Sequence, residues 1–498
     1  MQLAFQKQAF RYLGTGLQEI RNTEVTQEQR LPDGMPDIGR VLGTWGQVIL
    51  RSKEWQGSQA RATGGVMTWT LYAPEDGTEP RSVESWLPFD LKWETAPVNR
   101  EGPVLVLPLL RFADSRSISA RKIIVRAGVG ALAHGFYPEQ AEIGIPGELP
   151  DDVEILKNTY PLWLHVEAGE KTFLLDEELH VEADQPPEKM LSCTIYPQIQ
   201  EKRVLSDKLA LKGNVKIHLV CREPEGKVLS RILELPFSQL VQLDESHGTD
   251  AQAHIHMAVT SLEADMPEPG RLRIKSGLTA QYRISDQKIL ELVQDAYSPR
   301  RQVETEMAEL ELPVILEERQ DAVSVEQSVP GQFGVLGDGI YLPDFPRQRR
   351  NGNSLTLELS GLFQSLMYGE DGVLQPVNAR WEGNLSIPAD ENTRLIPSVH
   401  SDGSVDAAQT GEGMLLKSQM HLDLQSSVQQ KIPMVMSLEV GQQEVQDDAR
   451  PSLILTMGSG ESLWEIAKRC GSTVSAICAA NGLEGEPLQE RMLLIPVI

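Results

Sequence analysis

The chain has 498 residues, enough for several domains of ordinary size. Its formal net charge of -25 at pH 7 argues against a nucleic-acid-binding protein, because phosphate recognition needs clustered Lys and Arg. The acidic excess indicates either a solvated exterior or attraction to a basic partner surface. The richest apolar run, residues 104–110, is far shorter than the roughly 20 residues of a membrane-spanning helix, so we expect no membrane span.

The N-terminal segment lacks the basic region and unbroken apolar stretch of a secretory signal. We therefore expect the protein to stay in the cytoplasm of the cell that makes it. The cysteines fit that compartment, since they show neither a dense disulfide framework nor the paired spacing of a zinc site. We expect small buried residues at Cys193, Cys221, Cys470 and Cys478.

Residues 30–42 contain a Pro-Asp-Gly sequence followed closely by Pro-Asp, the residues that two successive tight turns use. This composition predicts a double turn that braces the surrounding unit. Contact with a partner is the alternative interpretation.

An internal repeat organises the first 445 residues. A strand-like segment at residues 65–72 is followed by an acidic turn and by Leu-Pro-Phe at residues 87–89. The same pattern returns 148 residues later at residues 213–220 and 235–237, without a gap. A third, degenerate copy begins at Gly361 and lacks the Leu-Pro-Phe.

Side chains in the repeated segment alternate in period two, as a half-buried antiparallel strand requires, and the turn completes a hairpin. The residues expected to point inward in the first two copies are Met67, Trp69, Leu71, Val215, Ile217 and Leu219. A second strand-like segment recurs at residues 123–127, 272–276 and 414–418. We therefore predict a mainly β protein built from three tandem, sandwich-like units.

Proline-rich or polar stretches separate the predicted units. We place these units at residues 1–182, 183–320 and 321–445, and a terminal domain at residues 452–498. The polar stretch at residues 442–451 has the composition of a flexible tether, which would make the terminal domain an appended head.

Helical periodicity is confined to a few places. Residues 287–296 would place Ile289, Leu290 and Val293 on one face of a helix, and a matching segment covers residues 153–160. These segments predict one short helix per unit, packed against a sheet.

The sequence lacks a phosphate-cradling glycine loop, a nucleophile elbow and an HExxH helix, so we expect neither an enzyme nor a bound cofactor. His254 and His256 would share one face of a strand, with Asp244 and His247 nearby in sequence. This set resembles a metal site. Two surface or hairpin histidines explain the pattern as well, and without other ligands at fixed spacing we expect no metal site.

The last 47 residues predict a miniature domain with the order strand, helix, helix, strand. Ser462 and Glu465 form a capping-box pattern, so a helix should begin at Leu463. Gly471 is suited to end that helix, because glycine accepts the left-handed conformation at little cost.

Ser472 or Thr473 would cap a second helix that ends at Asn481 and Gly482. The expected strands lie at residues 453–457 and 492–495. Together these signals predict a βααβ fold.

This pattern resembles the LysM domain, a small fold that in many proteins binds N-acetylglucosamine polymers such as peptidoglycan and chitin. The resemblance rests on residues 460–467, 481–483 and 494–496, which follow the family order. The family holds glycan mainly through backbone groups of the loop after the first strand and the loop before the last strand. The resemblance therefore implies a groove formed by Gly460, Glu461, Ser462, Leu463, Asn481, Gly482, Leu483 and Glu484.

One departure from the family affects this groove. Residues 489–491 are Gln-Glu-Arg, where the family usually has Pro-Gly-Gln. The change alters one lip of the expected sugar groove. Trp464 could stack on a sugar ring, but its position inside the first helix favours core packing.

Residues 30–42, the strand at residues 64–71 and the Leu-Pro-Phe at residues 87–89 resemble the SPOCS domain of endospore-forming Firmicutes. That domain recurs in tandem, often with a C-terminal LysM domain, in the clostridial spore-coat morphogenetic protein that binds the stage IV sporulation protein A ATPase. The resemblance implies a non-enzymatic adaptor of spore-coat assembly, located in the mother-cell cytoplasm at the forespore surface, whose LysM head docks such an ATPase. The alternative is a cell-wall-associated protein that binds peptidoglycan or N-acetylglucosamine oligomers.

Overall fold

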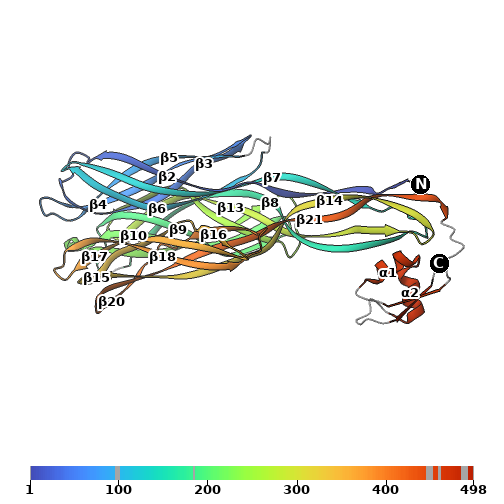
Figure 1. Ribbon diagram of the computed structural model, residues 1–498. Coiled ribbons are helices and arrows are strands. Elements are labelled where there is room, and N and C mark those ends of the chain that lie inside the picture. Colours follow the sequence, from blue (N-terminus) through green and yellow to red (C-terminus); the bar gives the residue numbers. More distant parts are fainter. Residues whose placement is uncertain are drawn as a thin grey trace.

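The computed structural model is an elongated bundle of long β-strands with a small helical module beside one end (Figure 1). It describes residues 2–95, 101–182, 185–444, 453–457, 461–483 and 492–496. Strands account for 78% of the residues and helices for 4%, which confirms the mainly β prediction. Within the described part of the chain, no helix is both long and apolar enough to cross a lipid bilayer.

Among the described residues, the first unit forms two three-stranded antiparallel sheets that pack on each other as a sandwich. The strand order is β2-β7-β6 in one sheet and β3-β4-β5 in the other. The strands are β2 Gln6–Arg30, β3 Ile38–Gln56, β4 Gln59–Pro74, β5 Arg81–Glu94, β6 Val104–Ser119 and β7 Lys122–Ile145.

The second unit repeats this arrangement in the part of the chain that the structure describes. Its sheets have the orders β8-β13-β12 and β9-β10-β11. The elements are β8 Glu154–His180, β9 Lys189–Leu205, β10 Lys208–Arg222, the short 3₁₀ helix η1 Pro224–Gly226, β11 Val228–Gln242, β12 Gln252–Glu268 and β13 Arg271–Tyr297.

The third unit has the same plan, but two strand positions are each divided into shorter strands. In one sheet β21 pairs with β14, β19 and β20, and also with the N-terminal strand β1; in the other β17 pairs with β15, β16 and β18. The divided positions agree with the expected degeneracy of this copy. The strands are β1 Gln2–Ala4, β14 Arg301–Pro330, β15 Phe333–Pro343, β16 Arg347–Asn351, β17 Ser354–Gly369, β18 Leu374–Pro388, β19 Arg394–His400, β20 Asp406–Thr410 and β21 Gly413–Glu444.

The backbone irregularities confirm the internal repeat. The first and last strands of each unit form the longest pairs, β2 with β7, β8 with β13 and β14 with β21. Each pair has a register shift at the same place, where Gly16, Val166 and Leu316 are left unpaired at intervals of 150 residues. A β-bulge that recurs in this way is a shared feature of the fold.

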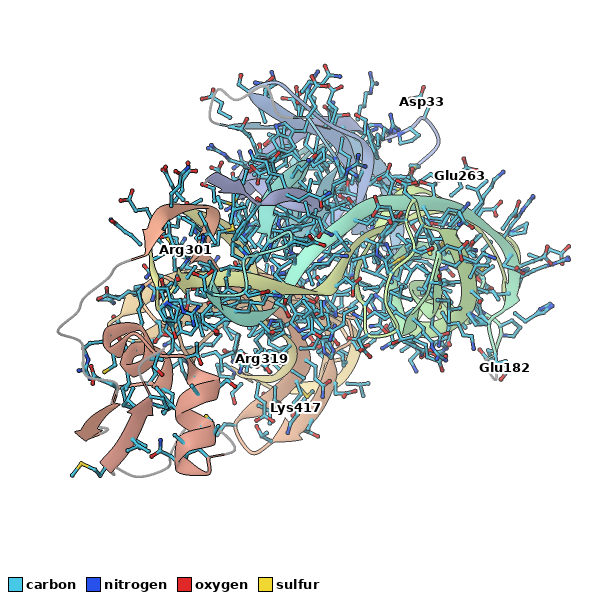
Figure 2. The ribbon with its side chains drawn as sticks, turned by 90° about the vertical axis from the view of Figure 1, so that its right-hand side faces the viewer. Asp33, Glu182, Glu263, Arg301, Arg319 and Lys417 are labelled. Atoms are coloured by element: carbon cyan, nitrogen blue, oxygen red, sulfur yellow. The ribbon has the colours of Figure 1, made fainter. Side chains whose placement is uncertain are left out.

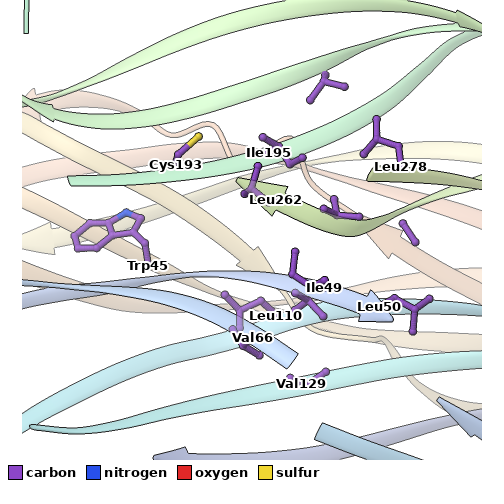
Figure 3. Close-up of a cluster of buried hydrophobic side chains, with 14 of the residues drawn as sticks. Trp45, Ile49, Leu50, Val66, Leu110, Val129, Cys193, Ile195, Leu262 and Leu278 are labelled. Carbon is purple, nitrogen blue, oxygen red and sulfur yellow. The ribbon is translucent and has the colours of Figure 1, made fainter. Parts of the chain in front are cut away.

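Viewed along the bundle, the three units surround a common axis (Figure 2). Asp33 marks the first unit, Glu263 the second and Lys417 the third. The largest hydrophobic cluster contains side chains from all three. Figure 3 shows Trp45 and Val66 of the first unit in the same cluster as Cys193 and Ile195 of the second.

The prediction of two helices within the units is wrong. Residues 287–296 belong to β13 and residues 153–160 belong almost entirely to β8, and the two segments pair with each other. Their exposure follows period two, because Leu290 and Leu292 are buried whereas Ile289 is 67% exposed. Pairing between distant segments therefore overrode a local helical pattern.

Strand pairing also groups the chain differently from the expected divisions. β8 pairs with β13 and therefore belongs with the second unit, and β14 pairs with β21 in the third. By pairing, the units comprise residues 6–145, 154–297 and 301–444, and β1 at residues 2–4 joins the third unit. The polar residues 317–322, expected at a boundary, lie inside β14.

The repeated central strand differs from the gap-free alignment by one residue. Gly213 pairs with Phe237, and Gly64, not Gly65, pairs with Phe89. A Cβ atom added to either Gly64 or Gly213 would lie 2.7 Å from the Cζ atom of its phenylalanine, so the two glycines occupy the same environment.

This offset changes which side chains share a face. A slip of one residue moves every side chain of a strand to the opposite side. The equivalents of Val215 and Ile217 are therefore Val66 and Thr68, which are buried, whereas the expected Met67 is half-buried. Trp69 and Leu71 are buried as well, since both faces of β4 are covered along much of its length.

The double turn at residues 30–42 braces the first unit, as predicted. The guanidinium group of Arg121 donates to the carbonyl oxygens of Pro32 and Met35 at 2.9 Å and to Asp37 at 2.8 Å. The hydroxyl of Tyr72 donates to the carbonyl oxygen of Pro36 at 3.1 Å. These contacts fix the double turn to strand β4 and to the turn between β6 and β7.

Candidate functional site

The terminal module has the predicted order of elements. They are β22 Leu453–Met457, α1 Leu463–Cys470, α2 Val474–Asn481 and β23 Met492–Pro496, and β22 pairs with β23 in the antiparallel sense. The helices contact each other, and α2 contacts β23. Among the described residues of this module, the buried hydrophobic side chains are Leu463, Trp464, Ile466, Ala467, Cys470, Ile477, Leu493 and Ile495.

The first helix begins and ends as its sequence predicts. The backbone N–H of Glu465 donates to the Ser462 hydroxyl at 3.3 Å, and the Ser462 backbone N–H donates to the Glu465 carboxylate at 2.9 Å. This reciprocal capping box satisfies two of the free donors at the helix start. Gly471 then ends the helix in the left-handed conformation with φ of 65°.

The second helix is capped by Thr473, one of the two candidates. Its hydroxyl accepts a hydrogen bond of 3.1 Å from the backbone N–H of Ala476. Gly482 ends the helix with φ of 62°. Val474 and Cys478 are partly buried against the module core, so Cys478 is less buried than expected. The other cysteines, Cys193, Cys221 and Cys470, are buried as predicted.

The predicted groove residues at the start of α1 have defined structural partners. Glu461 is paired with Arg469, with 2.8 Å between the carboxylate and guanidinium groups. Ser462 is the helix cap, and the side chain of Leu463 is buried in the module core. Glu461 therefore presents the exposed charged group on this side of the expected groove.

The groove residues after α2 tie that helix to the last strand. The Asn481 amide group donates to the carbonyl oxygens of Ile477 and Leu494 at 2.8 and 2.7 Å, and it accepts from the Leu494 backbone N–H at 2.8 Å. Gly482 ends the helix, and Leu483 packs on the same core as Leu463. Hydrophobic packing thus links the two predicted groove segments.

Several predictions fall outside the described residues. These are the groove residues Gly460 and Glu484, the Gln-Glu-Arg departure at residues 489–491, and residues 445–451 of the expected tether.

The module docks on the bundle through α1. The indole N–H of Trp464 donates to the carboxylate of Asp295 at 2.9 Å, and the Lys468 ammonium group donates to both oxygens of that carboxylate at 2.8 Å. The rings of Trp464 and Tyr297 pack edge to face with 4.8 Å between centroids. The Tyr297 hydroxyl also donates to the carbonyl oxygen of Ser472 at 3.0 Å.

This docking contact was absent from the sequence prediction. Trp464 is buried, as expected, but it packs on the end of β13 and not only inside its own module. Asp295 lies in the segment that was mistaken for a helix, and Tyr297 directly follows that segment. The i, i+4 spacing of Trp464 and Lys468 was the available signal, because it places both on one helix face.

Electrostatic interactions at Asp295 favour docking of the module on the bundle. Burial opposes ionisation of this carboxyl group, but hydrogen bonds from Lys468 and Trp464 outweigh it and hold the pKa of Asp295 below its ordinary value of 3.8. For Tyr297, burial raises the pKa of the phenol, with the nearby Glu154 and Asp295 adding to the effect. The phenol therefore remains a neutral hydrogen-bond donor.

The histidine set near residue 254 separates into two places. The His247 ring lies 2.9 Å from the carboxylate of Glu167, which also accepts from the backbone N–H of Asp244. His254 and His256 lie elsewhere, with ring centroids 4.6 Å apart. His247 and Asp244, which are near His254 and His256 in sequence, therefore do not belong to the same cluster in the structure.

Comparison with curated proteins and with solved structures gave no significant match. The resemblance of residues 1–445 to SPOCS domains stays a prediction. The terminal module, with its capped helices and paired strands, does match a known family. Residues 456–489 match the family model of the LysM domain, and the terminal module is therefore a LysM domain.

Proposed function

We propose that the protein is a non-enzymatic assembly adaptor in which the β bundle is a scaffold and the LysM domain is its recognition head. The observation that carries this proposal is the docking of the head at the end of β13, through Trp464, Lys468 and Tyr297. Such a contact gives the head a defined orientation relative to a long bundle. An adaptor that links two layers of an assembly needs this property.

The proposed setting is the developing spore coat, on the mother-cell side of the forespore. The partner of the head would be a coat morphogenetic ATPase similar to stage IV sporulation protein A. Support comes from the SPOCS-like motifs of residues 30–42 and 87–89, combined with three tandem units of one topology and a terminal LysM domain.

Glycan binding by the head is the second candidate function, and the family match favours it. LysM domains generally bind peptidoglycan or other N-acetylglucosamine polymers. Because the side chains of Leu463 and Asn481 are engaged within the module, recognition would use backbone groups of these segments and the exposed Glu461. The protein would then be associated with the cell wall.

Binding assays on the full-length chain separate the two candidates. We would titrate it with chitin oligomers, sediment it with purified peptidoglycan, and capture it with the purified coat ATPase. The matched variants are Glu461→Arg, at the predicted groove, and Glu263→Arg, on the second unit away from it. The adaptor proposal expects capture by the ATPase that is lost in Glu461→Arg and kept in Glu263→Arg.

The opposite result would favour the glycan candidate. Saturable binding to chitin oligomers that is sensitive to Glu461→Arg, with no capture by the ATPase, would contradict the coat proposal. A fluorescent fusion gives an independent check during sporulation. The adaptor proposal expects a ring around the forespore, whereas a uniform signal along the vegetative wall would contradict it.

A further inference from the structure

A partly open cavity of about 430 Å³ lies where the sandwiches of the three units meet. Its walls come from β3 and β6 of the first unit, β9 and β12 of the second, and β14, β15, β19 and β21 of the third. Most of this wall is apolar. One side is polar, with His256, His400, His421, Gln320 and Asp423.

Three potential metal ligands converge near that polar side, because His256 and Asp423 line the cavity and also line a small second pocket together with His254. His254 and His256 are alternate residues of β12, so their side chains share one face. Asp423 comes from β21 of the third unit. One ligand atom from each of the three residues lies within 4.8 Å of the other two. The sequence indicated no metal site because it showed no further ligand at a fixed spacing. The fold supplies such a ligand, Asp423, from a different unit.

We propose that His254, His256 and Asp423 form a binding site for a divalent transition-metal ion such as Zn²⁺, which joins the second unit to the third. Two imidazoles and one carboxylate are a ligand set that zinc accepts in proteins. Zinc sites with three protein ligands keep a fourth position for water, and the adjacent cavity provides room for it.

The pKa values of the three groups reflect their buried surroundings. Burial, with the nearby charge of Arg283, lowers the pKa of His256 to about 3 and that of His254 well below its ordinary value. Burial would raise the pKa of Asp423, but hydrogen bonds from His400 and Gln320 hold it low.

The surroundings provide outer partners for the carboxylate. Gln320 donates to one oxygen of Asp423 at 2.7 Å, and the Ser398 hydroxyl lies 3.4 Å from the other. The Nδ1 atom of His400 is 3.5 Å from that second oxygen, and its ring stacks on His421. Such partners orient a ligating carboxylate.

Nearby charges set the expected affinity. Arg283 lies opposite His254 in the β12–β13 ladder, and its guanidinium group is 3.5 Å from the carboxylate of Glu318. Lys202 contributes a further positive charge, although burial lowers its pKa. Glu318 offsets part of this positive field. We therefore expect weaker binding than at a structural zinc site made of thiolates.

The site is specific to one junction of the repeat. In the second unit, His254 lies opposite Arg283 in the strand ladder. The equivalent pairs are Leu105 with His134 in the first unit and Ile396 with Gln425 in the third. The three units thus carry different residues at equivalent positions around the axis. His256 likewise corresponds to Leu107 and Ser398. A metal ligand pair arises in the second unit alone among these described positions.

Zn²⁺ binding to the full-length protein tests the proposal. The chain is treated with a chelator, checked by circular dichroism, and titrated calorimetrically with Zn²⁺. We expect one equivalent per chain and a rise in melting temperature on binding. His256→Gln and Asp423→Asn should each weaken Zn²⁺ binding by at least about tenfold, since loss of even an outer-sphere partner costs about that much. The matched control is His180→Gln at an exposed position.

Several outcomes would overturn the proposal. These are absence of stoichiometric Zn²⁺ uptake by the folded chain, unchanged affinity in both site variants, or an equal loss in His180→Gln. If a site variant fails to fold, X-ray absorption spectroscopy of the Zn²⁺-loaded native chain decides instead. A spectrum with two imidazole ligands and oxygen supports the site, and one without imidazole rejects it.

Discussion

Trp464 of the LysM domain donates its indole N–H to Asp295 at the end of β13, with 2.9 Å between donor and acceptor. Lys468, one helical turn later, contacts the same carboxylate. A single acidic residue of the bundle therefore receives both polar side chains of the docking face. We therefore expect the orientation of the head to depend on Asp295.

The first prediction concerns this carboxylate. Asp295→Asn should release the head from the bundle, because the amide loses the ion pair with Lys468 and weakens the bond from Trp464. Hydrogen bonds to charged groups contribute about 1.5 to 3 kcal/mol, and partial exposure of Lys468 favours the lower end. Hydrogen exchange should show faster exchange in residues 463–470 and 291–297.

Glu291→Gln is the matched control, since this residue lies on the same strand in an exposed pair with Lys157. It should leave exchange of the head unchanged. Equal protection of the head in Asp295→Asn and in the native chain would contradict the docking role.

The second prediction concerns pH. The pKa of Asp295 lies below its ordinary value of 3.8 in the docked state, so docking is fully stabilised above that value and weakens as pH falls through the lower, docked-state pKa. Small-angle scattering should detect release of the head as the solution is acidified below about pH 4. The Asp295→Asn variant should lose this step, and a step of the same size in the variant would assign it to other carboxyl groups.

The third prediction concerns the glycines at equivalent places in the repeat. A Cβ atom at Gly213 would lie 2.0 Å from the carbonyl oxygen of Gln198, and one at Gly64 would lie 2.1 Å from that of Ile49. Gly213→Ala and Gly64→Ala should each destabilise the fold by about 1 to 3 kcal/mol, the usual cost of overpacking. Urea unfolding midpoints measure the effect.

A glycine in open space provides the control for that comparison. Gly147→Ala has no atom within 4 Å of the new methyl group, so its midpoint should barely change. Similar midpoints for all three variants would show that the close approach at Gly64 and Gly213 is relieved at little cost.

The fourth prediction concerns the thiols. Burial raises the pKa of Cys193 to about 12 and that of Cys221 to about 11, so few thiolates form at neutral pH. A thiol reagent should modify both residues only when the chain unfolds. The half-buried Cys478 should give the fast reaction of the native protein, and Cys478→Ser should remove it. A fast native reaction that depends on Cys193 would contradict the buried assignment.

Local sequence signals determined the terminal module almost completely. Ser462, Glu465 and Thr473 cap helices through groups a few residues away, and Gly471 and Gly482 end them through their own backbone conformations. These caps and helix ends depend on residues within one turn of the chain, so they can be predicted directly from the sequence. The groove assignment depended on family resemblance, and it stays a prediction.

The internal repeat was also visible in sequence, but its register was not. Period-two alternation cannot distinguish Gly64 from Gly65 as the partner of Phe89, because a slip of one residue preserves the pattern while reversing the faces. The helices expected at residues 153–160 and 287–296 failed for a related reason. Each segment found its hydrogen-bond partners in the other, more than a hundred residues away.

The amino-acid sequence by itself determined the β class, the threefold repeat and the LysM module, because each arises from short-range patterning of turns, caps and alternating side chains. Tertiary structure alone decided that Asp295 meets Trp464 and that Asp423 joins His254 and His256. These residues are brought together by the pairing and packing of long strands, and no local pattern encodes which distant strands will meet.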